Sequence, residues 1–172
     1  GRRCVERFNG MFAFAIWDSK RKEIFIARDR LGKKPLFYYH NGKKFVFASE
    51  IKSILKAGIR TSINKETLYF YLNYGYTPTN KSIFSNVHKL EAGCTLLFKD
   101  SKIDIERYWQ IDFSDKIDND EDFFIKKIRE HLDLAVRRRM IADVPVGAFL
   151  SGGLDSSAIV AYAKKYKNNL KT

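Results

Sequence analysis

The sequence has 172 residues, of which 45% are hydrophobic and 15% aromatic, and this is enough apolar material to bury a core in one domain or in parts of two. The formal net charge is +12, but the basic residues occur in short groups spread along the chain, so we expect a solvated surface and no nucleic-acid partner. The chain contains no apolar run of about 18 residues, so the sequence predicts no membrane span.

The first part of the chain is predicted to be rich in strands. Residues 11–17 carry apolar side chains on both alternating sets of positions, and residues 23–27 repeat this pattern after a polar turn. Such strands are buried on both faces. A sheet of this kind needs a covering layer on each side.

Turn and cap residues divide the next segments. Asn41-Gly42 predicts a hairpin, Ser49 and Asn64 are expected to cap two helices, and Gly58 is expected to end the first of them. The predicted elements in chain order are strand 36–39, strand 44–48, helix 50–57, helix 65–73, strand 95–99 and strand 103–108.

A polar, acidic stretch at residues 112–119 is predicted to be a linker, so that residues 1–111 form one domain and residues 120–172 belong to a second. Residues 120–142 show the spacing of a long amphipathic helix. The helix carries Arg137-Arg138-Arg139 near its end, where positive charge is favourable in itself, so we assign these arginines a structural role.

A glycine-rich segment lies between a predicted buried strand at 146–150 and a helix from Ala158 onward. Glycines let the backbone approach a ligand closely, and N–H groups at a helix start attract anions, so the sequence predicts a phosphate site. The segment lacks the lysine of the common P-loop, and Phe149 stands where a nucleophile elbow needs glycine. The residues assigned to this site are Leu150, Ser151, Gly152, Gly153, Leu154, Asp155, Ser156 and Ser157.

This S-G-G-L-D-S-S segment resembles the pyrophosphate loop of ATP pyrophosphatases, which adenylate a substrate and release pyrophosphate. The resemblance implies that ATP and Mg²⁺ are the cofactors, that the serine hydroxyls and backbone amides hold the leaving phosphates, and that Asp155 holds the metal through the pyrophosphate. The alternative is an ordinary strand-to-helix turn in which Asp155 and Ser156 cap the helix.

Together with segments 8–18, 27–39 and 47–52, the loop makes the whole sequence resemble bacterial glutamine-hydrolysing asparagine synthetases. The resemblance implies the later part of a class II glutamine amidotransferase domain, an αββα sandwich of the Ntn-hydrolase type, followed by the start of an α/β ATP-binding domain. It also implies an enzyme that makes asparagine from aspartate, ATP and glutamine-derived ammonia through β-aspartyl-AMP. A cytoplasmic location is expected from the two cysteines, Cys4 and Cys94, which show neither metal-ligand spacing nor a redox pair and fit a reducing compartment. The resemblance is compatible with a homodimer. The same loop serves related amidotransferases that act on another acid or sugar acceptor, and this remains an alternative.

One departure from the family concerns the nucleophile. Family members use an N-terminal cysteine whose own amine is the base. The sequence here begins Gly1-Arg2-Arg3, and the nitrogen of Cys4 lies in a peptide bond, so no catalytic residue is assigned. We therefore expect an internal fragment that is inactive by itself, either as part of an enzyme or as a truncated product. Arg28 and Asp29 are expected to form a structural ion pair and turn.

Overall fold

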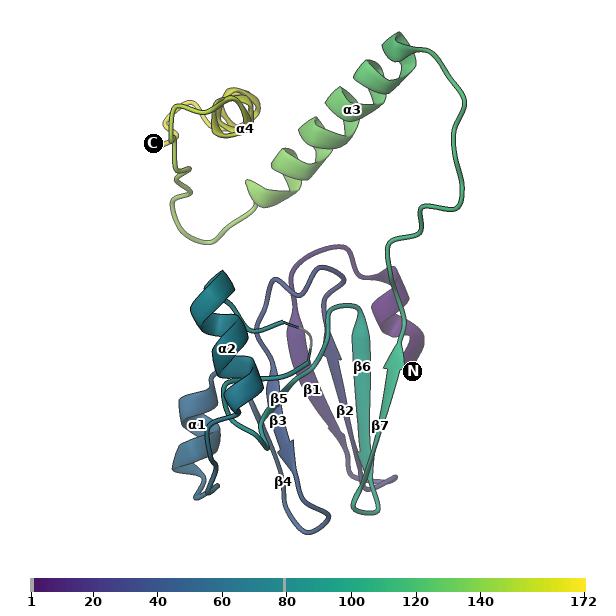
Figure 1. The fold of residues 1–172 in the computed structure, drawn as a ribbon. Coiled ribbons are helices and arrows are strands. Elements are labelled where there is room, and N and C mark those ends of the chain that lie inside the picture. The colour runs from purple at the N-terminus through teal and green to yellow at the C-terminus, as the bar shows by residue number, and fades with distance from the viewer. Residues whose placement is uncertain (1, 79) are drawn as a thin grey trace. The chain divides into compact units, whose positions relative to one another are not determined.

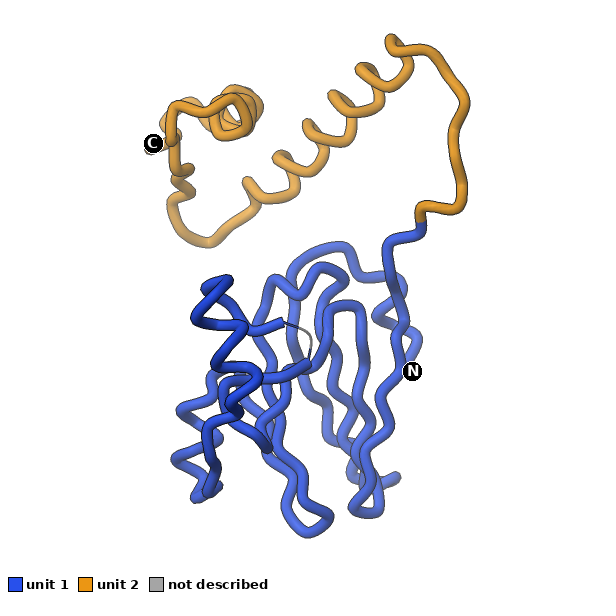
Figure 2. The backbone as a smooth tube through the Cα atoms, viewed as in Figure 1, with its two compact units in different colours: residues 1–112 blue, residues 113–172 orange. Residues whose placement is uncertain are grey.

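The computed structural model describes residues 2–78 and 80–172. The chain forms two compact units, Gly1–Asp112 and Phe113–Thr172 (Figure 2). None of the helices in the described ranges is both long enough and apolar enough to cross a membrane.

The first unit contains two antiparallel sheets (Figure 1). The larger sheet has the strand order β1-β2-β6-β7, and the smaller has the order β4-β3-β5. The strands are β1 (Ala13–Asp18), β2 (Glu23–Arg28), β3 (Phe37–His40), β4 (Phe45–Ala48), β5 (His88–Lys89), β6 (Cys94–Lys99) and β7 (Lys102–Arg107).

The two sheets share one hydrophobic core. Ile26 and Leu96 from the larger sheet are fully buried in the same cluster as Tyr38 from the smaller sheet. At the margin of this cluster the rings of Phe45 and Phe98 stack with centroids 4.4 Å apart. The sheets therefore pack face to face, and apolar burial between them is the main stabilising contribution.

A short helix packs on the outer face of each sheet. The 3₁₀ helix η1 (Arg2–Arg7) buries Val5 with Phe25 of β2 on the outer side of the larger sheet. Helix α1 (Ile51–Lys56) buries Ile54 with Tyr39 of β3 on the outer side of the smaller sheet. The order of layers is helix, sheet, sheet, helix, and the predicted αββα architecture is confirmed.

Strand β1 differs from its prediction. β2 is buried on both faces, as expected, but β1 leaves Ile16 and Trp17 about half exposed. The reason is position, because β1 is the edge strand of its sheet and lies next to β2 alone. The alternation of apolar residues identified the strand correctly but could not show that both of its faces lack a cover at the end that carries Ile16 and Trp17.

Local turn and cap chemistry accounts for the helix boundaries. Asn64 accepts a hydrogen bond from the backbone N–H of Thr67 and caps α2 (Lys65–Tyr74), as predicted. The cap predicted at Ser49 is wrong, because α1 begins one residue later and its N-cap is Glu50, which makes no side-chain cap bond. Gly58 follows α1 with a φ of +79°, the left-handed conformation expected after a helix.

The second unit consists of two helices and their connections. Helix α3 (Glu121–Arg139) is capped by Asp120, which accepts the N–H of Phe123, and it ends three residues before the predicted boundary. Helix α4 (Leu154–Lys164) follows the glycine-rich segment.

Among residues 2–78 and 80–172, the segment predicted as a buried strand at 146–150 forms one bridge, from Gly147 to Lys171. Phe149 is fully exposed there, at 101% of its reference area. A strand is buried only when neighbouring strands and a covering layer enclose it, and the bridge to Lys171 supplies neither.

Candidate functional site

The glycine-rich segment makes a sharp turn from extended backbone into α4. Gly152 has a φ of +80°, which is the left-handed region where only glycine is free of a steric penalty. Gly153 returns to extended geometry, with φ −77° and ψ 162°, and is the N-cap of α4. The turn therefore requires glycine at position 152.

The N-terminus of α4 has no side-chain cap. The N–H of Ser157 is bonded to the carbonyl of Gly153 at 3.1 Å, so the N–H groups before it have no acceptor within the helix. N–H groups of this kind and the positive end of a helix dipole are suited to an anion. Asp155 and Ser156 lie inside the first turn rather than at the N-cap, so they do not make the capping bonds that the alternative of an ordinary turn expected.

The side chains of the loop are grouped where the extended segment turns into α4. The hydroxyl oxygens of Ser151 and Ser156 lie 3.0 Å apart, and the Ser156 hydroxyl also donates to the carbonyl of Gly153 at 3.0 Å. Leu154 is 86% exposed, and Asp155 and Ser157 are exposed as well. The loop can therefore present two hydroxyls, a carboxylate and several N–H groups to one ligand.

In the first unit the buried carboxylate of Asp29 binds backbone N–H groups from two segments of the chain. Its carboxylate is only 1% exposed and accepts four backbone N–H groups, at distances between 2.9 and 3.2 Å. The donors are Phe12, Leu31, Lys33 and Lys34. Burial alone would raise the pKa of the Asp29 carboxyl, but the four donors outweigh burial and hold this pKa below its ordinary value.

Arg28, the residue before Asp29, binds backbone carbonyl groups. Its guanidinium donates to the carbonyls of Gly32, Lys34 and Leu90, at 2.6 to 2.8 Å. These hydrogen bonds go to backbone groups, so the expected pairing of Arg28 with Asp29 is replaced by two separate sets of backbone contacts. The expected scaffold role is confirmed, because both residues tie the turn at 31–34 to the sheets.

We expect Asp29→Asn to destabilise the first unit by about 2 to 3 kcal/mol at neutral pH, because the amide loses the charge and points an NH₂ group at N–H donors. The folded pKa of Asp29 lies below its unfolded value of about 3.9, so its contribution is complete above that pH and is lost as pH falls through the folded pKa. Denaturant unfolding of the chain at pH 7 and at pH 3 measures both effects.

The matched control for this substitution is Asp18→Asn. Asp18 also accepts two backbone N–H groups, from Lys20 and Arg21, but at an exposed turn. A loss of stability in the control as large as that in Asp29→Asn would contradict the role given to the buried carboxylate.

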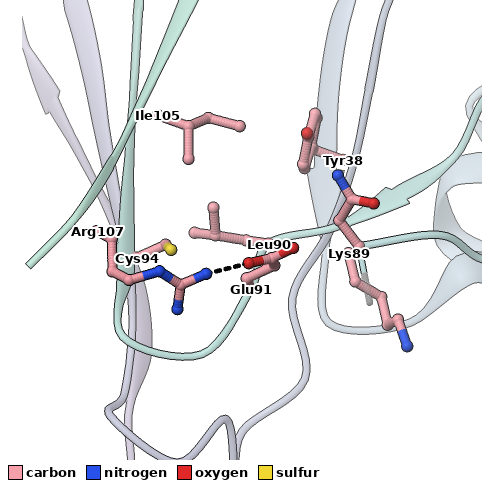
Figure 3. A pocket seen from close by; sticks show the side chains of 8 residues that line it. Tyr38, Lys89, Leu90, Glu91, Cys94, Ile105 and Arg107 are labelled. Carbon is pink, nitrogen blue, oxygen red and sulfur yellow. Dashed lines mark hydrogen bonds and ion pairs between the residues drawn. The ribbon is translucent and has the colours of Figure 1, made fainter. Parts of the chain in front are cut away.

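A cavity of about 260 Å³ opens between the two sheets of the first unit (Figure 3). The residues that line it are Tyr38, Asn80, Lys89, Leu90, Glu91, Cys94, Ile105 and Arg107. Sequence reasoning missed this cavity, because its lining comes from several strands that are far apart in the chain and carries no local motif.

The three charged side chains of the cavity, Lys89, Glu91 and Arg107, already have partners in the described part of the chain. Arg107 pairs with Glu91 and donates to the carbonyl of Ala92 at 3.0 Å, and Lys89 donates to the hydroxyl of Thr77 at 3.1 Å. Burial raises the pKa of the Cys94 thiol, which favours the unreactive protonated form. The cavity therefore presents an ion pair and a neutral thiol rather than a prepared nucleophile.

Comparison with known proteins gives two family matches. The model of the glutamine amidotransferase domain matches residues 1–109, which is more than half of the chain. The asparagine synthase model matches residues 127–172, the part that contains the loop and α4.

Individual relatives agree with these matches. A putative glutamine-hydrolysing asparagine synthetase of Methanocaldococcus jannaschii is 44% identical over 95% of this chain and 32% of its own length. Asparagine synthetase 3 of Bacillus subtilis is 43% identical over 93% of this chain and 26% of its own length. A protein named amidase chry2 from Gibberella zeae is 35% identical over 90% of this chain and 23% of its own length.

The chain thus spans about a third or less of the length of the curated relatives it matches. Both family matches lie in the order in which the sequence motifs occur. The chain belongs to the glutamine amidotransferase domain family, and its C-terminal segment matches the asparagine synthase family, as the resemblance in the sequence predicted.

Proposed function

We propose that this chain works as part of a glutamine-dependent asparagine synthetase and that residues 150–157 bind the phosphates of ATP. The observation that carries the proposal is the uncapped N-terminus of α4, which follows a glycine held at a φ of +80°. The names of the relatives and the asparagine synthase match support the choice of reaction.

The residues of the loop fit ATP with Mg²⁺. The free N–H groups at the start of α4 and the hydroxyls of Ser151 and Ser156 would hold the β- and γ-phosphates. Asp155 offers an exposed carboxylate in the same first turn, and Mg²⁺ in nucleotide sites is commonly held by one or two carboxylates together with phosphate oxygens. Bound Mg²⁺ would neutralise the charge of the leaving pyrophosphate.

The proposed reaction has two steps. The side-chain carboxylate of aspartate attacks the α-phosphorus of ATP, which forms β-aspartyl-AMP and releases pyrophosphate. Ammonia from glutamine then forms a bond to the activated carbonyl carbon, and AMP leaves. We assign residues 1–111 to the glutaminase domain, 112–119 to a linker and 120–172 to the ATP-binding domain.

A second candidate is a related amidotransferase with another acceptor. The observation that favours it is the 35% identity to a protein named as an amidase, which is matched over the same part of the chain. The two candidates share the adenylating loop and differ in the acid that is activated. Release of pyrophosphate that depends on aspartate would support the synthetase, whereas release with another acid and not with aspartate would support the second candidate.

We expect Asp155→Asn to lower pyrophosphate release from ATP and aspartate by at least about tenfold in the complete enzyme, because a metal-binding charge is lost while shape is kept. Asp122→Asn is the matched control, since Asp122 lies in the first turn of α3 and is outside the loop. Turnover that is unchanged in Asp155→Asn would remove this residue from the site.

A further inference from the structure

Within the second unit, the C-terminal end of α4 is tied to α3 by one carboxylate. Asp133 of α3 accepts the hydroxyl of Tyr166 at 2.5 Å on one oxygen and the ammonium of Lys165 at 3.3 Å on the other. The ammonium of Lys165 also lies 4.2 Å from the ring centre of Tyr162 on α4. The hydrogen bond from Tyr166 lowers the pKa of Asp133, so the carboxylate is charged at neutral pH.

The other end of α4 carries the phosphate loop. Ser156 lies in the first turn of the helix, and its hydroxyl touches that of Ser151 on the other side of the turn. The segment before the loop has its own attachment, because the N–H of Ala148 donates to the carbonyl of Lys171 at 2.9 Å. The loop is thus held from two sides, by this backbone bridge and by α4.

An α-helix behaves as a short rigid rod, so an anchor at one end limits the directions that the other end can take. The 11 residues of α4 correspond to about 16 Å along the axis. The free N–H groups at its start point along this axis, and a change in helix direction moves all of them together relative to Ser151. The contacts of Asp133 with Lys165 and Tyr166 therefore influence where the N–H groups of the loop lie relative to Ser151.

We propose that Asp133 is a positioning residue for the phosphate loop and acts through Lys165 and Tyr166 by fixing the direction of α4. This inference rests on the proposed function, in which the loop binds ATP. The apparent dissociation constant of a ligand rises when a smaller fraction of the protein is in the binding-competent conformation. Loss of the anchor reduces that fraction and leaves the groups that touch the phosphates unchanged.

The test compares Asp133→Ala and Tyr166→Phe in the complete enzyme. We expect the KM for MgATP to rise about two- to fivefold, which is the range for hydrogen bonds at partly exposed sites, while kcat changes by less than about twofold. This split distinguishes positioning from a general loss of folded protein, which would lower the measured kcat and leave KM unchanged. Tyr166→Phe keeps the ring and is the milder variant where Asp133→Ala folds poorly.

Glu130→Ala is the matched control. Glu130 also lies on α3 and forms an ion pair, but its partner Lys127 is on the same helix, at 2.9 Å. We expect the KM for MgATP to be unchanged in this variant. A rise in KM equal to that of Asp133→Ala would overturn the proposal.

Hydrogen exchange of the full chain, without nucleotide, gives a second and independent readout. We expect faster exchange at residues 157–160, the first amides of α4 that have acceptors within the helix, in Asp133→Ala and in Tyr166→Phe than in the unmodified chain. Unchanged exchange there overturns the positioning role. If the unmodified enzyme releases no pyrophosphate from ATP, the proposed function fails instead, and the exchange measurement still decides whether Asp133 orders the loop.

Discussion

Replacement of Gly152 by valine is expected to abolish the binding of MgATP to the complete enzyme. The φ of Gly152 is +80°, and a β-branched side chain is strongly disfavoured in that conformation. Among the described residues, no protein atom lies within 4 Å of a Cβ added at position 152, so the expected loss of binding does not come from a clash with the protein. The branched side chain would distort the turn and fill the open space where the phosphates are expected to lie. Calorimetric titration with MgATP measures the effect.

Gly42→Val is the matched control for this prediction. Gly42 has a φ of +83° and also has no atom within 4 Å of an added Cβ, but it lies in the hairpin between β3 and β4. The control carries the same kind of backbone strain away from the loop, and we expect it to bind MgATP normally. Retained affinity in Gly152→Val would mean that the loop binds in a different conformation or does not bind ATP.

The largest expected effect on stability is that of Gly93→Ala. An added Cβ would lie 2.2 Å from the carbonyl oxygen of Trp109, and Gly93 has a φ of +66°. The surrounding backbone cannot move away easily, because hydrogen bonds hold Gly93 on both sides. Its carbonyl accepts the N–H groups of Tyr108 and Trp109, and its N–H donates to the backbone carbonyl of Asp29. We expect a loss of at least about 3 kcal/mol, from overpacking and backbone strain together.

Denaturant unfolding of the chain measures this loss, and Gly42→Ala separates its two causes. At Gly42 an added Cβ meets open space, so only the cost of the left-handed conformation remains, about 1 to 2 kcal/mol. Equal losses in the two variants would show that the contact with Trp109 does not matter.

Features set by neighbouring residues could be predicted from the sequence. The hairpin at Asn41-Gly42 forms because Asn41 accepts the N–H groups of Lys43 and Lys44, and these contacts need nothing beyond the turn itself. The cap at Asn64 is local in the same way. The glycine-rich loop could be recognised from its motif, and the positive φ at Gly152 is a local reason for glycine at that position.

Features that depend on distant partners could not be predicted. The apolar run at 146–150 has the pattern of a buried strand, but burial requires neighbouring strands, and the described part of the chain supplies one bridge, to Lys171. The exposure of Trp17 follows from the edge position of β1, which no local pattern reveals. The anchor at Asp133 joins residues 32 and 33 positions apart and has no sequence signature.

The fate of ATP tests the central proposal most directly. The complete enzyme would be supplied with aspartate, glutamine, Mg²⁺ and ATP that carries separate labels in its α- and γ-phosphates, and the labelled products would be separated. The proposal predicts AMP that retains the α-label and pyrophosphate that retains the γ-label, in equal amounts and dependent on aspartate. ADP and inorganic phosphate as the only products would contradict it.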